Sequence, residues 1–173
     1  MWKLTEDQLN VAEFLATKAD PRRPRQAALR RAVSTAYYAL FQALSKMCAD
    51  ALVGWTQPWQ AFTPIFRSVE HGRTLTVLNE RGPNRTHPLG VEVETIGAAF
   101  RELQAAREWA DYSPEPHPDP RRTAEGALFS RAEAVALVAA ARAAVSGLES
   151  LDARTKLRLA TLLVTRSRKE IRR

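Results

Sequence analysis

Apolar residues recur every three or four positions along most of the chain, the spacing that places them on one face of an α-helix. The longest stripe lies between Arg25 and Ala51, and a second runs from Val91 to Tyr112. The pattern predicts an all-α protein, an antiparallel bundle of four to five helices with additional short helices. The residues expected to face the core are Leu29, Val33, Ala36, Tyr37, Leu40, Phe41 and Leu44 in the first stripe, and Ile96, Phe100, Leu103, Ala106, Trp109 and Ala110 in the second.

Two further long helices begin at pairs of residues with the spacing of a capping box. The first helix is expected to start at Thr5, with Gln8 as its partner, and to end near Asp20. Another starts at Ser130, with Glu133 as its partner, and runs to about residue 145 or beyond. In the first helix, the residues predicted to point inward are Leu9, Val11, Ala12, Leu15 and Ala16.

The middle of the chain is less regular. Pro64 fits the first turn of a short helix that ends at His71, with Gly72 as the residue after its end. Residues 74–80 fit either a further short helix or a loop. Residues 81–90 contain two prolines and two glycines, and residues 113–122 contain four prolines, so both segments are predicted to be loops.

Length and composition favour one domain with a tail. A chain of 173 residues is long enough for a single substantial core. We expect a helical bundle over residues 1–150, followed by a C-terminal helix with a basic tail over residues 151–173. The alanine-rich composition and the presence of only seven glycines agree with a helical protein.

The formal net charge is +7, and the excess comes from 21 arginines rather than from 5 lysines. Arginine matches phosphate geometry better than lysine does, which favours a nucleic-acid partner. A genome rich in G and C would produce the same bias, so charge alone leaves both explanations open. The residues expected to contact nucleic acid are Arg30, Arg31, Arg166, Arg168, Lys169, Arg172 and Arg173; for the tail, a solvated, frayed end is the alternative.

Several classes of protein are disfavoured. The first 20 residues carry charges every few positions, unlike a signal peptide, and no apolar run is long enough to span a membrane. The single cysteine, Cys48, suits a reducing compartment, so we expect a cytoplasmic protein without membrane partners. Three scattered histidines and one cysteine give no metal-ligand spacing, and no glycine-rich phosphate loop is present, so neither a metal nor another cofactor is expected.

Four segments together resemble a known family. They are "LRRAVSTAYYALFQAL" (29–44), "FRSVEHG" (66–72), "FRELQAAREWADYSP" (100–114) and "FSRAEA" (129–134). In order and spacing they resemble the bacterial branch of the HEPN superfamily, named for higher eukaryotes and prokaryotes nucleotide-binding, over residues 5–150. The resemblance implies a helical bundle, usually a homodimer, in a superfamily of RNases, toxins and nucleotide-binding modules.

One polar stripe on the longest helix is a candidate interface. Arg30, Ser34 and Tyr38 recur at every fourth position, and we expect Ser34 and Tyr38 to lie near the dimer interface. A solvated helix face is the alternative explanation. Tyr37, by contrast, shares the face of the apolar stripe and is predicted to be core.

The resemblance also implies candidate catalytic residues, because catalytic HEPN proteins carry an arginine and a histidine separated by four to six residues. A histidine can move the proton of an RNA 2′-hydroxyl or of the leaving oxygen, while an arginine stabilises the charge that grows on the phosphate. Arg67 and His71 lie in the resembling segment with three intervening residues, and one helix would place them on a shared face. Arg81 and His87 have five intervening residues but lie in the predicted loop.

Three functions remain open at this level. The first is a metal-independent endoribonuclease of toxin or defence type, acting through Arg67 and His71. The second is a non-catalytic module that binds a nucleotide, RNA or a partner protein such as an antitoxin or a nucleotidyltransferase, with His71 only capping a helix end. The third is a small interaction protein whose basic tail aids solubility.

Overall fold

The computed structural model describes residues 2–18, 25–54, 56–112 and 129–165. This part of the chain forms seven helices and no strand, which confirms the all-α class. The four long helices are α1 (Lys3–Lys18), α2 (Arg25–Leu52), α5 (Val91–Tyr112) and α6 (Arg131–Ser150). The three shorter ones are α3 (Trp59–Ser68), α4 (His71–Leu78) and α7 (Ala153–Val164).

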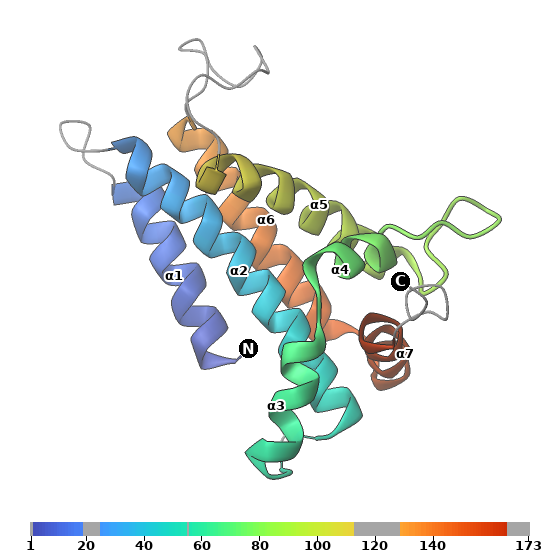
Figure 1. Cartoon of the computed structure of the whole chain (residues 1–173). Coiled ribbons are helices and arrows are strands. Elements are labelled where there is room, and N and C mark those ends of the chain that lie inside the picture. Colours follow the sequence, from blue (N-terminus) through green and yellow to red (C-terminus); the bar gives the residue numbers. More distant parts are fainter. Residues whose placement is uncertain (1, 19–24, 55, 113–128, 166–173) are drawn as a thin grey trace.

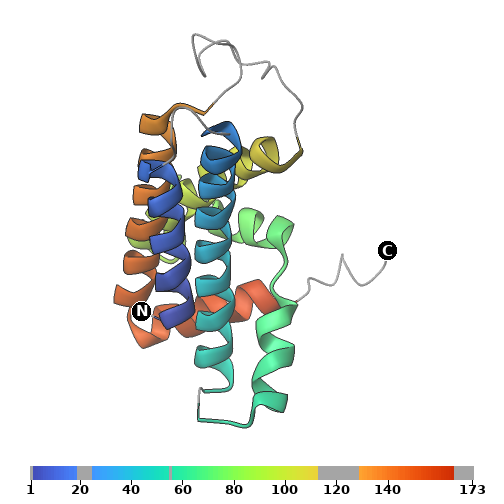
Figure 2. The ribbon, with the colours of Figure 1, turned by 90° about the vertical axis from the view of Figure 1, so that its left-hand side faces the viewer.

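The long helices form a bundle in which α1 and α5 run opposite to α2 and α6 (Figures 1 and 2). Helix α2 is the central element, since it contacts α1, α3, α5, α6 and α7. At the lower end in Figure 1, α3 projects beyond the bundle and α7 crosses beneath it. The chain turns sharply between α6 and α7, with a bend of 114°.

The core lies where α2 meets its neighbours. The inward face of α2 alternates large side chains such as Tyr37 and Leu40 with alanines such as Ala36, and all three are fully buried. The alanines let neighbouring helices approach closely, and Phe100 and Leu103 of α5 fill the space beside them. The two apolar stripes predicted for α2 and α5 are therefore confirmed, except that Phe41 is only half-buried.

Helix α1 differs from its prediction at two points. It begins at Lys3 rather than at Thr5, so Thr5 lies inside the first turn and is buried instead of capping the helix. Val11, predicted to point inward, is 51% exposed. The first turn is therefore fixed by packing of Thr5 against the rest of the protein. The predicted capping box does not form.

The central segment forms two helices instead of one. Pro64 lies in the interior of α3, which begins at Trp59 and ends at Ser68. Val69 and Glu70 are extended, with ψ angles of 124° and 138°. His71 then opens α4, so the prediction that one short helix ends at His71, with Gly72 after its end, is wrong.

Helix α4 continues through most of the segment that the sequence left undecided, and it ends in close contact with α5. Gly97 of α5 lies directly against Leu78, the last residue of α4. A Cβ atom on Gly97 would lie 2.2 Å from the Leu78 carbonyl oxygen. Glycine at this position is therefore required for the observed approach of the two helices.

The last two helices have side-chain caps. The Ser130 hydroxyl accepts a hydrogen bond from the Glu133 N–H at 3.0 Å, which confirms the predicted helix start. At α7, Asp152 accepts from the Thr155 N–H at 3.0 Å. The hydrogen bonds from Thr155 hold the pKa of the Asp152 carboxyl below its usual value.

No single described helix is both long and apolar enough to cross a membrane. Only α6 and α7 taken together, across their sharp bend, reach that length and composition.

Candidate functional site

His71 lies at the start of α4, and its ring faces α2. Its Nδ1 atom is 2.5 Å from the hydroxyl oxygen of Tyr37. The ring stacks on Phe41, with 3.8 Å between the ring centroids. The other ring nitrogen, Nε2, has no hydrogen-bond partner among the described residues. The imidazole is thus held by one nitrogen and by stacking, while the second nitrogen remains available.

Arg107 of α5 lies near enough to His71 for its charge to lower the pKa of the imidazole. Its Nε forms an ion pair with Asp111 at 2.9 Å, one helical turn further along. Its Nη2 donates to the hydroxyls of Tyr38 and, at 3.2 Å, of Tyr112. The guanidinium also lies over both tyrosine rings, 5.2 and 5.0 Å from their centroids. These contacts fix the cation in one orientation while Nη1 has no partner in the described part of the chain.

The two groups are linked through the tyrosines of α2. The ring of Tyr37 lies 5.6 Å from the His71 ring and 5.7 Å from the Arg107 guanidinium carbon. Burial lowers the pKa of His71, and the positive charge of Arg107 lowers it further. His71 is therefore neutral near neutral pH, and it can accept a proton. Burial also raises the pKa of Tyr37, which keeps this phenol protonated.

We refer to these side chains as the His71–Arg107 cluster. Its members come from three helices: Ser34, Tyr37 and Tyr38 from α2, His71 from α4, and Arg107, Asp111 and Tyr112 from α5. The arrangement places a neutral imidazole with an available nitrogen close to a fixed cation. Such a combination can transfer a proton and stabilise a negative charge on the same bound group.

Arg67, the predicted partner of His71, is not part of this cluster. It lies near the end of α3, whereas His71 opens α4, so the expectation that the two share one helix face is wrong. Two extended residues change the direction of the chain between them. The Arg67 side chain is exposed, and no hydrogen bond, ion pair or ring contact within the described residues joins it to His71.

Both members of the alternative pair, Arg81 and His87, make contacts that hold their loop in place. His87 is 3% exposed, and both of its ring nitrogens are engaged. Nδ1 accepts from the Leu89 N–H at 3.0 Å, so Nε2 carries the proton and donates to the Val77 carbonyl at 2.9 Å. Arg81 forms an ion pair with Glu94 at 2.7 Å. His87 therefore attaches this loop to the end of α4.

The polar stripe on α2 faces α5 of the same chain. The Ser34 hydroxyl is buried and donates to Asp111 at 3.2 Å, and Tyr38 accepts from Arg107. The guanidinium of Arg30 lies 4.7 Å from the ring centroid of Trp109. The stripe thus has contacts within one chain that explain its spacing. A role of Ser34 and Tyr38 at a dimer interface stays a prediction.

Most of the predicted nucleic-acid contacts cannot be placed. Arg31 is exposed on α2, and Arg30 is half-buried. The tail residues Arg166, Arg168, Lys169, Arg172 and Arg173 lie outside the described residues.

The sequence singles out His71 as a candidate base, but not Arg107 as its neighbour. Arg107 lies in "FRELQAAREWADYSP" (100–114), which carries part of the resemblance, but nothing in that segment marks it as a partner of a histidine. One local signal was present, because Arg107 and Asp111 have the spacing of an ion pair on a helix. Nothing in the sequence, however, indicates that this pair lies beside His71.

The described residues offer neither an accessible thiol nor a cluster of metal ligands. Cys48 is buried, and burial raises the pKa of its thiol to about 12. In the part of the chain that the structure describes, no three His, Cys, Asp or Glu side chains converge on a possible metal site. Comparisons with protein-family models, curated proteins and solved structures find no match for this chain.

Proposed function

We propose that the chain is a HEPN-like protein that acts on RNA as a metal-independent endoribonuclease of toxin or defence type. The observation that carries the proposal is the His71–Arg107 cluster, in which an imidazole with an available nitrogen lies beside a fixed guanidinium. The proposal includes a homodimer, a cytoplasmic location and an antitoxin or nucleotidyltransferase as a partner. It replaces Arg67 by Arg107 as the phosphate-stabilising residue.

The chemistry requires a base and a cation at one phosphate. Neutral His71 takes the proton of the 2′-hydroxyl, whose oxygen attacks the adjacent phosphorus. The bond from phosphorus to the 5′-oxygen breaks, and this oxygen takes a proton from water. Arg107 stabilises the negative charge of the phosphorane through its unpartnered Nη1. The products are a 2′,3′-cyclic phosphate and a 5′-hydroxyl end.

Neighbouring side chains position these two groups. For Nε2 of His71 to act as the base, Nδ1 must carry the proton and donate to the Tyr37 hydroxyl oxygen. Asp111 and Tyr38 hold the Arg107 guanidinium so that it does not have to reorganise during the reaction.

A non-catalytic binding module is the second candidate, and one observation favours it. Arg107 already has an ion pair with Asp111 and hydrogen bonds to two tyrosines, which satisfy a large part of its donors. In that case the cluster stabilises the contact between α2 and α5, and exposed arginines such as Arg31 and Arg67 bind phosphate without cleaving RNA.

The test is cleavage of a mixed pool of structured and single-stranded RNA in EDTA. Arg107→Ala is compared with Arg67→Ala, both purified in the same way as the wild type. We expect cleavage by the wild type and by Arg67→Ala, strongly reduced cleavage by Arg107→Ala, and cyclic-phosphate ends. A substrate with a 2′-deoxynucleotide at the mapped cleavage site should resist.

Other outcomes identify a different function. Loss of cleavage in Arg67→Ala alone would restore the pair predicted from sequence. Binding of the same RNA by the wild type at low salt, without cleavage, would favour the binding module. Folding of Arg107→Ala is checked by circular dichroism, and Arg107→Lys serves as a second variant that retains the charge but not the planar fork.

A further inference from the structure

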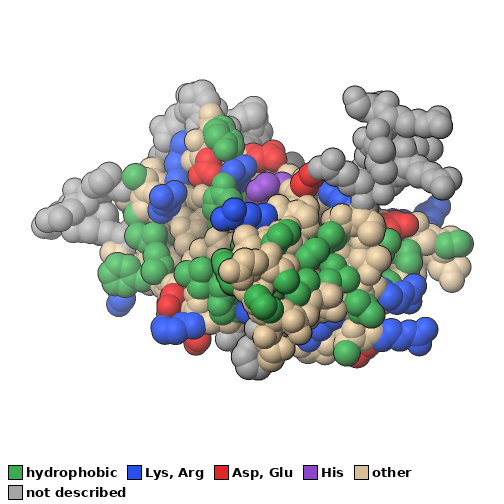
Figure 3. Space-filling model, turned by 60° about the horizontal axis from the view of Figure 1, so that its bottom comes forward, with side chains coloured by type: hydrophobic (Ala, Val, Ile, Leu, Met, Phe, Trp, Pro, Cys, Tyr) green, Lys and Arg blue, Asp and Glu red, His purple; other side chains and the backbone are tan. Residues whose placement is uncertain are grey.

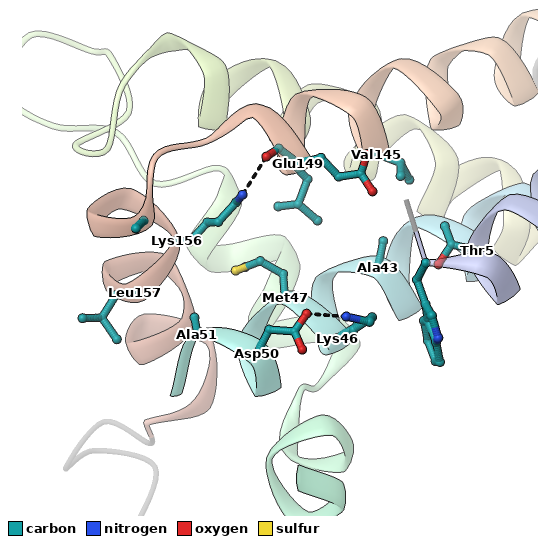
Figure 4. A pocket seen from close by; sticks show the side chains of 13 residues that line it. Thr5, Ala43, Lys46, Met47, Asp50, Ala51, Val145, Glu149, Lys156 and Leu157 are labelled. Carbon is teal, nitrogen blue, oxygen red and sulfur yellow. Dashed lines mark hydrogen bonds and ion pairs between the residues drawn. The ribbon is translucent and has the colours of Figure 1, made fainter. Parts of the chain in front are cut away.

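A cavity lies at the end of the bundle opposite the start of α2. It is a cavity of about 520 Å³ between the beginning of α1, the second half of α2, the end of α6 and the beginning of α7 (Figure 4). A volume of this size suits a small organic molecule. The cavity shares no residue with the His71–Arg107 cluster.

The walls of the cavity are largely apolar. Met47 of α2, Val145 and Leu148 of α6, and Leu157 of α7 line it, together with several alanines. Trp2 lies at its edge, where its ring packs edge-on against Phe66 of α3 at 5.9 Å. Apolar side chains also gather in the middle of the molecular face shown in Figure 3. Burial of an apolar ligand group against these walls would remove its surface from water, which is favourable.

Charged side chains of both signs surround these walls. Lys46 and Asp50 of α2 form an ion pair on one side of the cavity. Lys156 of α7 lies across from them and donates to the backbone carbonyl of Glu149 at 2.6 Å, with Met47 between the two groups in the view of Figure 4. The lining thus offers two lysines and two carboxylates. Its charges balance, so the cavity matches neither a simple anion nor a simple cation.

Two polar atoms of the lining residues lack partners among the described residues. One is the hydroxyl oxygen of Thr5, which is 1% exposed, and the other is Oδ1 of Asp50. The second carboxylate oxygen of Asp50 already accepts from Lys46. A buried acceptor without a donor is costly, and nearly all such groups in proteins have a partner. The Asp50 side chain as a whole is 33% exposed and lines the cavity, so a ligand ammonium group can pair with its carboxylate.

We propose that this cavity binds a small zwitterion with a large apolar body, such as an α-amino acid with an aromatic or branched side chain. The carboxylate of the ligand faces Lys156, its ammonium group faces Asp50, and its apolar body lies along Met47 and Leu148. Opposite charges on one small molecule satisfy both sides of the cavity at once. The site is independent of the proposed RNA chemistry.

The test uses three probes that share one aromatic body. L-phenylalanine carries both charges, 2-phenylethylamine only the positive one and 3-phenylpropionate only the negative one. Each is titrated into the full chain by isothermal calorimetry. We expect L-phenylalanine to bind at least about tenfold more tightly than either of the others, because each loses one charge-assisted hydrogen bond.

Variants assign the binding to this cavity. Asp50→Asn should weaken L-phenylalanine but leave 3-phenylpropionate unchanged, whereas Lys156→Met should weaken L-phenylalanine but leave 2-phenylethylamine unchanged. Asp7→Asn is the matched control, because Lys3 and Asp7 form an ion pair of the same spacing on the exposed face of α1. It should not alter any of the three affinities.

Three results would overturn the proposal. They are no binding of any probe at millimolar concentration, equal binding of all three, or equal loss of L-phenylalanine binding in Asp7→Asn and Asp50→Asn. If a cavity variant fails to fold, the comparison of the three probes on the wild-type chain still decides the charge requirement.

Discussion

His71 opens α4, and His87, from the loop that follows, contacts the carboxyl end of this helix. The two rings have opposite environments. At the amino end, His71 has one ring nitrogen on Tyr37, a stacked phenylalanine and a second nitrogen without a partner. At the carboxyl end, His87 is buried and has both nitrogens bonded to backbone groups. The same side chain is thus open to chemistry at one end of the helix and part of the scaffold at the other.

The difference shows how to separate a candidate base from a structural histidine. Spacing to an arginine favoured His87, because Arg81 precedes it by the expected interval. Hydrogen-bond satisfaction favours His71, since a base needs a free lone pair and a position beside the reacting group. The carboxyl end of α4, held by His87 and Gly97, then positions the amino end.

The largest expected effect concerns activity. His71→Ala should lower RNA cleavage by about 10²- to 10⁴-fold, the usual contribution of a general acid or base. His87→Ala should retain cleavage at temperatures where it is folded, because its ring makes no contact with the cluster. Initial cleavage rates, measured beside unfolding curves, check this pair. An equal loss in a fully folded His87→Ala protein would remove the distinction between the two ends.

The next largest effect concerns stability, at the contact between Gly97 of α5 and Leu78 of α4. Gly97→Ala should lower the free energy of unfolding by about 3 kcal/mol, since the new methyl group must displace Leu78 or α5. Urea denaturation measures the change. Gly147→Ala is the control, because its Cβ would meet only Ile96 at ordinary contact distance. Equal stabilities of the two variants would mean that α4 does not approach α5 as described.

Removal of the His87 ring should lower the free energy of unfolding by a smaller amount. His87→Ala is expected to cost about 2 kcal/mol, because the Val77 carbonyl and the Leu89 N–H lose their partners. Arg81→Ala, which removes only an exposed ion pair with Glu94, should cost less than about 1 kcal/mol. Chemical denaturation of both variants tests the order, and a reversed order would show that the ion pair holds the loop.

The smallest effect is the dependence of stability on pH. The pKa of His71 is lower in the folded protein than its ordinary value of 6.5, so the unfolded chain binds this proton more tightly. Stability should therefore fall as the pH drops below 6.5, until folded His71 is protonated too. In His71→Gln, this part of the dependence of stability on pH should be absent.

Nuclear magnetic resonance titration of the His71 ring tests the cause. Arg107→Met should raise the pKa of His71 only in part, because burial is the larger cause and remains. Arg67→Met should leave it unchanged. A shift in the second variant alone would place Arg67, not Arg107, beside the ring.

Local periodicity was sufficient to predict the framework. The stripes of α2 and α5 are long and regular, and their bounds agree with the sequence to within a residue. The break between α3 and α4 has no comparable signal, since Ser68, Val69 and Glu70 contain neither glycine nor proline. Pro64 was misleading, because it lies inside α3 rather than in its first turn.

The candidate site was only half predictable. His71 is one of three histidines and could be selected by chemistry, but Arg107 is one of 21 arginines. What distinguishes Arg107 is its approach to Tyr37 and Tyr38, which depends on how α5 crosses α2. The bonds that make His87 structural go to backbone atoms, which leave no trace in the pattern of side chains.

The division of the cluster between α4 and α5 has a consequence for biosynthesis. A ribosome releases His71 well before Arg107, and synthesis advances at roughly 5–20 residues per second. During that interval the nascent chain contains α2 and α4 but lacks the guanidinium and Asp111 that complete the cluster. The His71–Arg107 cluster therefore forms only after α5 has emerged and folded onto α2.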